Sequence, residues 1–177
     1  MENYFLRIVL ALTFLGALQA SAWTNSQDAG LLLGAAKIKE ITFEKSSSSL
    51  SQLYKDELRV AIQEAGRSGD IAEVKILAWS DKEYPSTSGH QSREDVKLAK
   101  KRLSDIKSYL KGLRVSDVAT YNMTERPNAL QKLFHTQTEK VKKTAEMAGA
   151  APTADQTGLF DNEAQASKSI VMIFMKK

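Results

Sequence analysis

The sequence has 177 residues, which suits one domain with short extensions. Its net charge of +4 is far below that of a typical nucleic-acid-binding surface, so no nucleic-acid partner is expected. Cysteine is absent and only two histidines occur, which excludes disulfides, thiol nucleophiles, lipid attachment through cysteine, and cysteine- or histidine-rich metal sites.

The first 22 residues are predicted to be a cleaved signal peptide. Arg7 precedes an apolar run from Ile8 to Leu18, and Ala20-Ser21-Ala22 is a small-x-small cleavage sequence. The run is shorter than the roughly 20 apolar residues of a membrane span, and an uncleaved anchor is the alternative interpretation. We therefore expect an exported chain with a flexible lead-in over residues 23–36 and no integral membrane segment after cleavage.

The domain is predicted to span residues 37–177 and to begin with a strand at Lys37–Glu44. The serines at Ser46–Ser49 indicate a loop that can start a helix, and apolar residues then recur at helical spacing as far as Ala65. A second strand is expected at Val74–Trp79. Its apolar side chains alternate onto both faces, which indicates a buried position within a sheet.

The second half of the domain is predicted to continue this alternation. An apolar stripe from Val96 to Leu113 indicates a long helix, and Val115–Tyr121 is expected to be the third strand. A further helix is expected from Pro127, followed by an exposed loop at 149–166 and a buried closing strand at Ile170–Met175. The order β-α-β-α-β-α-β predicts an α+β fold, with helices packed on a single sheet. The buried face of the last helix is expected to contain Leu130, Leu133, Phe134, Val141 and Ala145.

A series of short motifs spans the middle of the chain. Ser80-Asp81 ends a strand, Leu98-Ala99-Lys100-Lys101-Arg102 lies on the following helix, and Tyr109-Leu110 comes beyond that arginine. Residues 118–127 add a strand and a turn that ends in proline. In these features the sequence resembles the OmpA-like C-terminal domain, a family that binds peptidoglycan without covalent attachment.

The sequence departs from the pattern of that family at several places. Asp95 stands where the family has asparagine, and Tyr84 replaces a loop glycine. Both glycines of the turn before Pro127 are absent, and an inserted helix and loop occupy about residues 128–166.

The resemblance implies a site for the free end of meso-diaminopimelate, which carries one ammonium and one carboxylate, in the peptidoglycan stem peptide. The ligand-binding residues that it implies are Asp81, Arg102, Asp95 and Leu98. A carboxylate accepts hydrogen bonds from an ammonium, and a guanidinium binds a carboxylate through two parallel hydrogen bonds. Asp81 and Arg102, held apart by the fold, would supply one group of each sign. The alternative interpretation is that Arg102 covers core residues with its aliphatic part while Asp81 begins a turn.

The sequence does not predict an enzyme or a cofactor. It contains no Ser-His-Asp spacing, no Gly-x-Ser-x-Gly motif and no phosphate loop, and His90 and His135 are interpreted as surface residues. The leading hypothesis is a soluble module in the periplasm of a Gram-negative bacterium that binds peptidoglycan non-covalently. The alternative is a protein-interaction or structural subunit of the envelope, with the same fold but without peptidoglycan binding. The insertion and the missing turn glycines favour this alternative.

Overall fold

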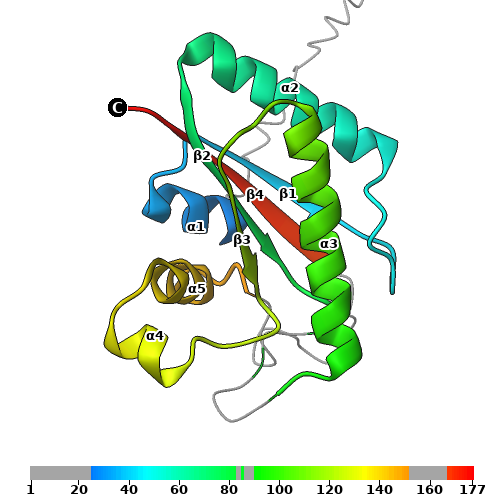
Figure 1. Cartoon of the computed structure of the whole chain (residues 1–177), viewed down its shortest axis with the longest axis vertical. Helices are drawn as coiled ribbons and strands as arrows, with labels where there is room; N and C mark the ends of the chain where they lie inside the picture. Colours follow the sequence, from blue (N-terminus) through cyan, green and yellow to red (C-terminus); the bar gives the residue numbers. More distant parts are fainter. Residues whose placement is uncertain (1–24, 83–84, 86–89, 152–166) are drawn as a thin grey trace, which may run out of the picture.

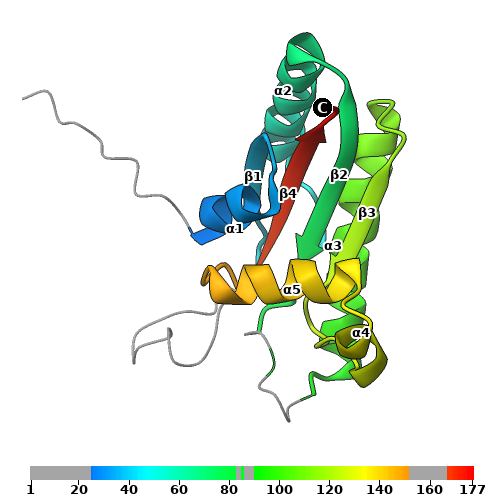
Figure 2. The ribbon, with the colours of Figure 1, turned by 90° about the vertical axis from the view of Figure 1, so that its left-hand side faces the viewer.

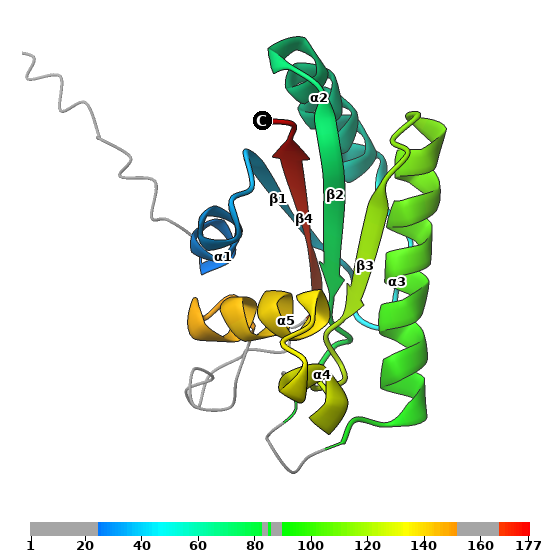
Figure 3. The same ribbon diagram turned by 60° about the vertical axis from the view of Figure 1, so that its left-hand side comes forward.

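The computed structural model describes residues 25–82, 85, 90–151 and 167–177. The predicted signal peptide, Tyr84 and most of the predicted loop 149–166 lie outside these ranges. No helix within the ranges is long and apolar enough to cross a membrane. The described residues form one sheet with helices on both of its faces, which Figures 1 to 3 show from three directions.

Four strands within the described ranges make one open sheet in the order β1-β4-β2-β3 (Figure 1). They are β1 (Lys37–Thr42), β2 (Ile71–Ala78), β3 (Val118–Asn122) and β4 (Lys168–Met175). β4 runs antiparallel to β1 and to β2, whereas β2 and β3 are parallel. The predicted alternation of strands and helices and the single sheet are confirmed, with one additional helix before β1. The apolar sequence of β4 suits its place, because an interior strand is buried on both faces.

Two helices, α2 (Gln52–Ser68) and α3 (Arg93–Gly112), cover one face of the sheet (Figure 3). Ser51 and Ser92 precede these helices, and each side chain accepts a hydrogen bond from a backbone N–H of the first turn. The apolar stripe predicted for α3 faces the sheet and contributes to the core there. The residues of α3 in this core are Leu103, Ile106 and Leu110.

Two other helices, α1 (Asn25–Leu33) and α5 (Gln137–Met147), cover the opposite face and contact each other (Figure 2). Leu77 and Trp79 belong to the core on this face, whereas Ile76 belongs to the core beneath α2 and α3. The predicted division of apolar side chains of β2 between two faces is therefore confirmed.

The helix α1 corrects the prediction of a flexible lead-in over residues 23–36. Its buried side is made of small residues, including Ala29 and Gly30. A Cβ atom placed on Gly30 would lie only 2.3 Å from Cγ1 of Ile38, so the absence of a side chain is what allows α1 to pack closely against β1. Small residues give a helix little hydrophobic periodicity, and the sequence therefore did not predict this one.

The helix predicted after β3 is divided into α4 (Ala129–Leu133) and α5. His135 lies at the break with a positive φ of 46°, and Thr136 caps the start of α5. Val141 and Ala145 are buried, as predicted. The prediction is wrong for the apolar residues before the break, because α4 contains no buried residue. These exposed side chains are Leu130, Leu133 and Phe134.

The chain beyond α5 turns back against the end of that helix. Ala150 and Ala151 are completely buried, and the backbone N–H of each donates to the carbonyl oxygen of Ala145. The predicted exposure of the loop 149–166 is therefore wrong for these two residues.

Candidate functional site

The predicted site is centred on Arg102, whose side chain is completely buried where α3 packs on the sheet. An arginine side chain has five N–H donors. In this structure the five have acceptors inside the protein, and these come from the segments that follow β1 and β2. The acceptors are Ser47 O, 2.8 Å from Nε; Trp79 O and Ser80 O, 3.0 and 2.8 Å from Nη1; and Asp81 Oδ1 and Glu44 O, 2.6 and 3.5 Å from Nη2.

Asp81 is the counter-charge of this buried arginine, and it is also bound by two serines. The backbone N–H of Ser46 donates to its Oδ2, and the hydroxyl of Ser167 donates to its Oδ1 at 2.7 Å. Ser167 immediately precedes β4. The pair of Asp81 and Arg102 thus connects the ends of β1 and β2, the start of β4, and α3.

The surroundings of the pair favour its charged form. Burial by itself would raise the pKa of Asp81, but the hydrogen bonds from Ser167, Ser46 and Arg102 outweigh it and hold the pKa below its usual value. Burial lowers the pKa of Arg102, and Asp81 opposes that effect. The guanidinium carbon also lies 4.6 Å from the centre of the Phe43 ring, in a cation–π contact.

The other two predicted site residues, Asp95 and Leu98, lie nearer the start of α3. Asp95 is almost completely buried, accepts a hydrogen bond from the hydroxyl of Ser92 at 2.6 Å, and forms an ion pair of 3.1 Å with Lys82. Burial would raise the pKa of Asp95, but hydrogen bonds from Ser92 and Lys82 hold it below its usual value. Leu98 is half-buried. The two residues share one face of α3 with Arg102, because all three lie three or four positions apart in succession.

The geometry of Asp81 and Arg102 differs from that expected for a site that binds a zwitterion. The fold does not hold the two charges apart, since they form an ion pair of 2.6 Å. The Asp81 side chain is only 12% exposed and Arg102 is not exposed at all. A ligand carboxylate would have to replace Asp81 or a backbone carbonyl to reach the guanidinium. The assignment of these residues to a ligand stays a prediction, and their contact with each other is the observed structure.

The sequence did not predict the other groups that bind Asp81 and Arg102. The segment Glu44–Ser47 supplies two carbonyl acceptors for Arg102 and one N–H donor for Asp81, whereas the serines there were interpreted only as a loop and a helix start. Every residue has a backbone carbonyl, so the residue type does not indicate which carbonyls will bind a buried arginine. Ser167 was also missed, although a small polar residue just before a buried strand is a reasonable partner for a buried carboxylate.

The lowered pKa of Asp81 leads to a prediction about acid stability. A carboxylate with a lower pKa in the folded state binds fewer protons there, so it adds stability above its unfolded pKa of about 3.9 and loses it as the pH falls through the folded value. Urea unfolding from pH 7 down to pH 3 should show that wild type is more stable than Asp81→Asn, with a difference that narrows at the acid end. A difference in unfolding free energy that stays constant from pH 7 to pH 3 would contradict the conclusion that Asp81 is charged in the folded protein.

Comparison with known proteins gives likenesses among solved structures. No family model matches the sequence, and no curated protein matches it. Among solved structures, the OmpA-like domain of FopA1 from Francisella tularensis subsp. tularensis SCHU S4 aligns with 79% of this chain and 73% of that chain, with a TM-score of 0.39 and 12% identity. The chain itself is an α+β protein with one four-stranded sheet in its described part, which is the fold class that the sequence predicted.

Proposed function

We propose that this chain is an exported, non-enzymatic module of the bacterial envelope that acts by binding another protein. In this proposal the ion pair of Asp81 and Arg102 stabilises the fold and does not bind a ligand. One observation carries it: the five N–H donors of Arg102 are bound by groups of the protein itself.

A receptor for a carboxylate offers donors that are free before the ligand arrives. Here a ligand would have to take the place of Asp81 or of a backbone carbonyl, and displacing Asp81 would also break its hydrogen bonds from Ser46 and Ser167. Removing one partner of a buried ion pair typically costs about 3–5 kcal/mol. A ligand end with a single carboxylate would first have to offset that loss, which favours an interaction through another surface.

Non-covalent binding of peptidoglycan through diaminopimelate is the second candidate. It is supported by the resemblance in sequence and by the position of the predicted residues. Asp95 lies in the first turn of α3 and forms an ion pair with Lys82, whose side chain is 65% exposed. Asp81 pairs with Arg102 farther along the same helix. A ligand at this end of the sheet would meet both signs of charge.

A pull-down with purified peptidoglycan separates the two candidates. The proposal predicts that wild-type protein is retained no better than a non-binding control, while an OmpA-like domain known to bind peptidoglycan is retained in parallel. Retention of wild type that free meso-diaminopimelate abolishes, and that Asp81→Asn loses while still folded, would support the second candidate and overturn the proposal. Lys101→Ala is the matched control, because Lys101 is exposed on the same helix beside Arg102.

A further inference from the structure

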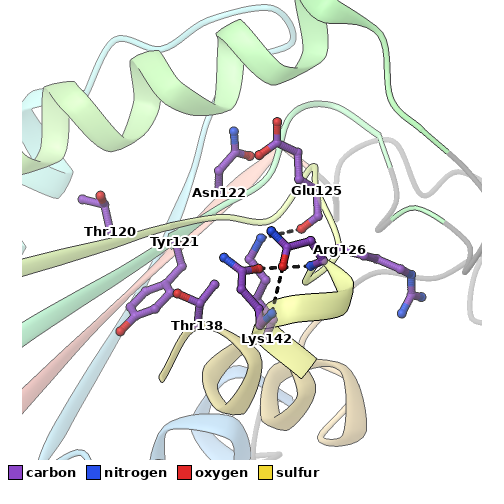
Figure 4. A pocket seen from close by; sticks show the side chains of 9 residues that line it. Thr120, Tyr121, Asn122, Glu125, Arg126, Thr138 and Lys142 are labelled. Carbon is purple, nitrogen blue, oxygen red and sulfur yellow. Dashed lines mark hydrogen bonds between the residues drawn. The ribbon is translucent and has the colours of Figure 1, made fainter. Parts of the chain in front are cut away.

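A separate pocket lies beside β3, an outer strand of the sheet. Its volume is 380 Å³ (Figure 4). β3 forms one wall, and the turn after β3, α4 and α5 form the others. The residues that matter for its chemistry are Thr120, Tyr121, Glu125, Arg126, Thr138 and Lys142.

The most unusual group in the pocket is the ammonium of Lys142. The residue is only 5% exposed, and its Nζ donates to the backbone carbonyl oxygen of Glu125. In the part of the chain that the structure describes, no carboxylate forms an ion pair with Lys142. Figure 4 shows the side chain of Glu125 directed away from Lys142 while its carbonyl faces it. Burial lowers the pKa of Lys142 to about 8, although the charge of Glu125 opposes this shift.

The other cation of the pocket does have a counter-charge. Both Nη atoms of Arg126 donate to the carboxylate of Glu146, at 3.0 and 2.8 Å, and its Nε donates to Pro85 O. The guanidinium is therefore neutralised within the protein. A buried cation is normally paired. Among the described residues Lys142 has only the carbonyl of Glu125 as a partner, so an anion is the ligand that would complete its surroundings.

The wall formed by β3 places a second requirement on the ligand. β3 is an outer strand of the sheet, and within the described ranges its only pairing partner is β2. The N–H of Val74 donates to Asp117 O and the N–H of Met123 donates to Ala78 O. In a parallel pair, residues along a strand alternate between facing the partner and facing away. The backbone N–H and C=O of Thr120 consequently point outward, away from β2, and Thr120 is one of the residues that line the pocket.

We propose that this pocket binds the end of an extended peptide with a free carboxylate, by strand addition along β3 at Thr120 and by a charged hydrogen bond from Lys142. An extended chain satisfies the outward backbone groups of an edge strand. A terminal carboxylate supplies the negative charge that Lys142 lacks. The two features line one cavity, so a single ligand can meet both. This inference deepens the proposed binding role and rests on it.

The test uses two degenerate libraries of seven-residue peptides that differ only at the C-terminus, a free acid in one and an amide in the other. Immobilised protein is incubated with each library, and bound peptides are quantified by mass spectrometry. Wild type is expected to enrich free acids over amides by about tenfold or more, the change expected for one charge-assisted hydrogen bond. N-methylation of the backbone of the best peptide, one position at a time, is expected to abolish binding at alternate positions, because those N–H groups pair with β3.

Lys142→Met should remove the preference for free acids and leave the melting temperature unchanged or higher, since it replaces a buried charge by an apolar chain of similar length. Lys143→Met is the matched control, because Lys143 is exposed next to it on α5. Equal recovery of acids and amides by wild type, or a preference for acids that persists in Lys142→Met, would overturn the inference. Neither result depends on retention by peptidoglycan, so the outcome is distinguishable from failure of the proposed function.

Discussion

Arg102→Ala is expected to lower the free energy of unfolding by about 3–5 kcal/mol, the typical cost of removing one partner of a buried ion pair. The substitution leaves Asp81 without its counter-charge. It also removes the donors for four backbone carbonyls that converge on the guanidinium from two segments of the chain. Arg102→Lys should be nearly as damaging, because one ammonium cannot reach all the acceptors that the planar guanidinium binds.

Urea unfolding followed by circular dichroism measures these differences. Lys101→Ala should stay within about 0.5 kcal/mol of wild type, as is usual for an exposed substitution. If Arg102 served mainly to hold a ligand, the stability of Arg102→Ala would be close to that of wild type. That result would contradict the structural role of Arg102 and would support its assignment to the predicted ligand site.

Trp79→Ala is expected to lower the free energy of unfolding by about 3–5 kcal/mol, because it leaves a large cavity in the core beneath α1 and α5. Trp79 is completely buried, yet its Nε1 has no hydrogen-bond partner among the described residues. Trp79→Phe retains a ring in this place and removes an N–H whose burial without a partner typically costs about 1–3 kcal/mol. We therefore expect Trp79→Phe to lose less than about 2 kcal/mol.

The same urea experiment compares the two variants. The backbone groups of Trp79 bond to Arg102 and to Lys168, and neither substitution removes them. The difference in unfolding free energy between Trp79→Ala and Trp79→Phe therefore depends on the side chain alone. A phenylalanine variant as unstable as the alanine variant would show that the indole N–H does have a partner.

The sequence predicted those parts of the fold in which the apolar pattern follows the geometry of an element. The stripe along α3 meets the sheet, as expected from the helical spacing of Leu103, Ile106 and Leu110. The pattern of β2 indicated burial on both faces, and both are covered. An apolar run too short for a helix correctly indicated the strand β4.

The apolar pattern gave wrong predictions where the apolar character of a residue and its burial do not correspond. α1 packs through small residues such as Ala29 and Gly30, which contribute almost nothing to periodicity. α4 shows the opposite error, because Leu130 and Leu133 have helical spacing but lie 65% and 70% exposed. Helical spacing predicts which residues share a face, but another element has to cover that face before they are buried.

The candidate site was predictable only in part. The resemblance in sequence pointed to Asp81 and Arg102, and the structure does bring them together. Their direct contact was not predicted, because arginine is rarely completely buried. The carbonyl groups that allow its burial here belong to residues far away in the sequence. Residue type alone gives no sign that Lys142 is buried. Its burial depends on how α5 lies against the turn after β3.

The place of β4 also determines when the molecule can fold. Within the described ranges β1 pairs only with β4, and β4 separates β1 from β2. Lys37 lies opposite Ile173, at the other end of the described chain. A ribosome makes β1 first and β4 last. A nascent chain that lacks β4 can pair β2 with β3 but cannot join β1 to them. The sheet is therefore completed only after synthesis has passed residue 175, in a step that closes almost the whole chain into a loop and is slow for that reason.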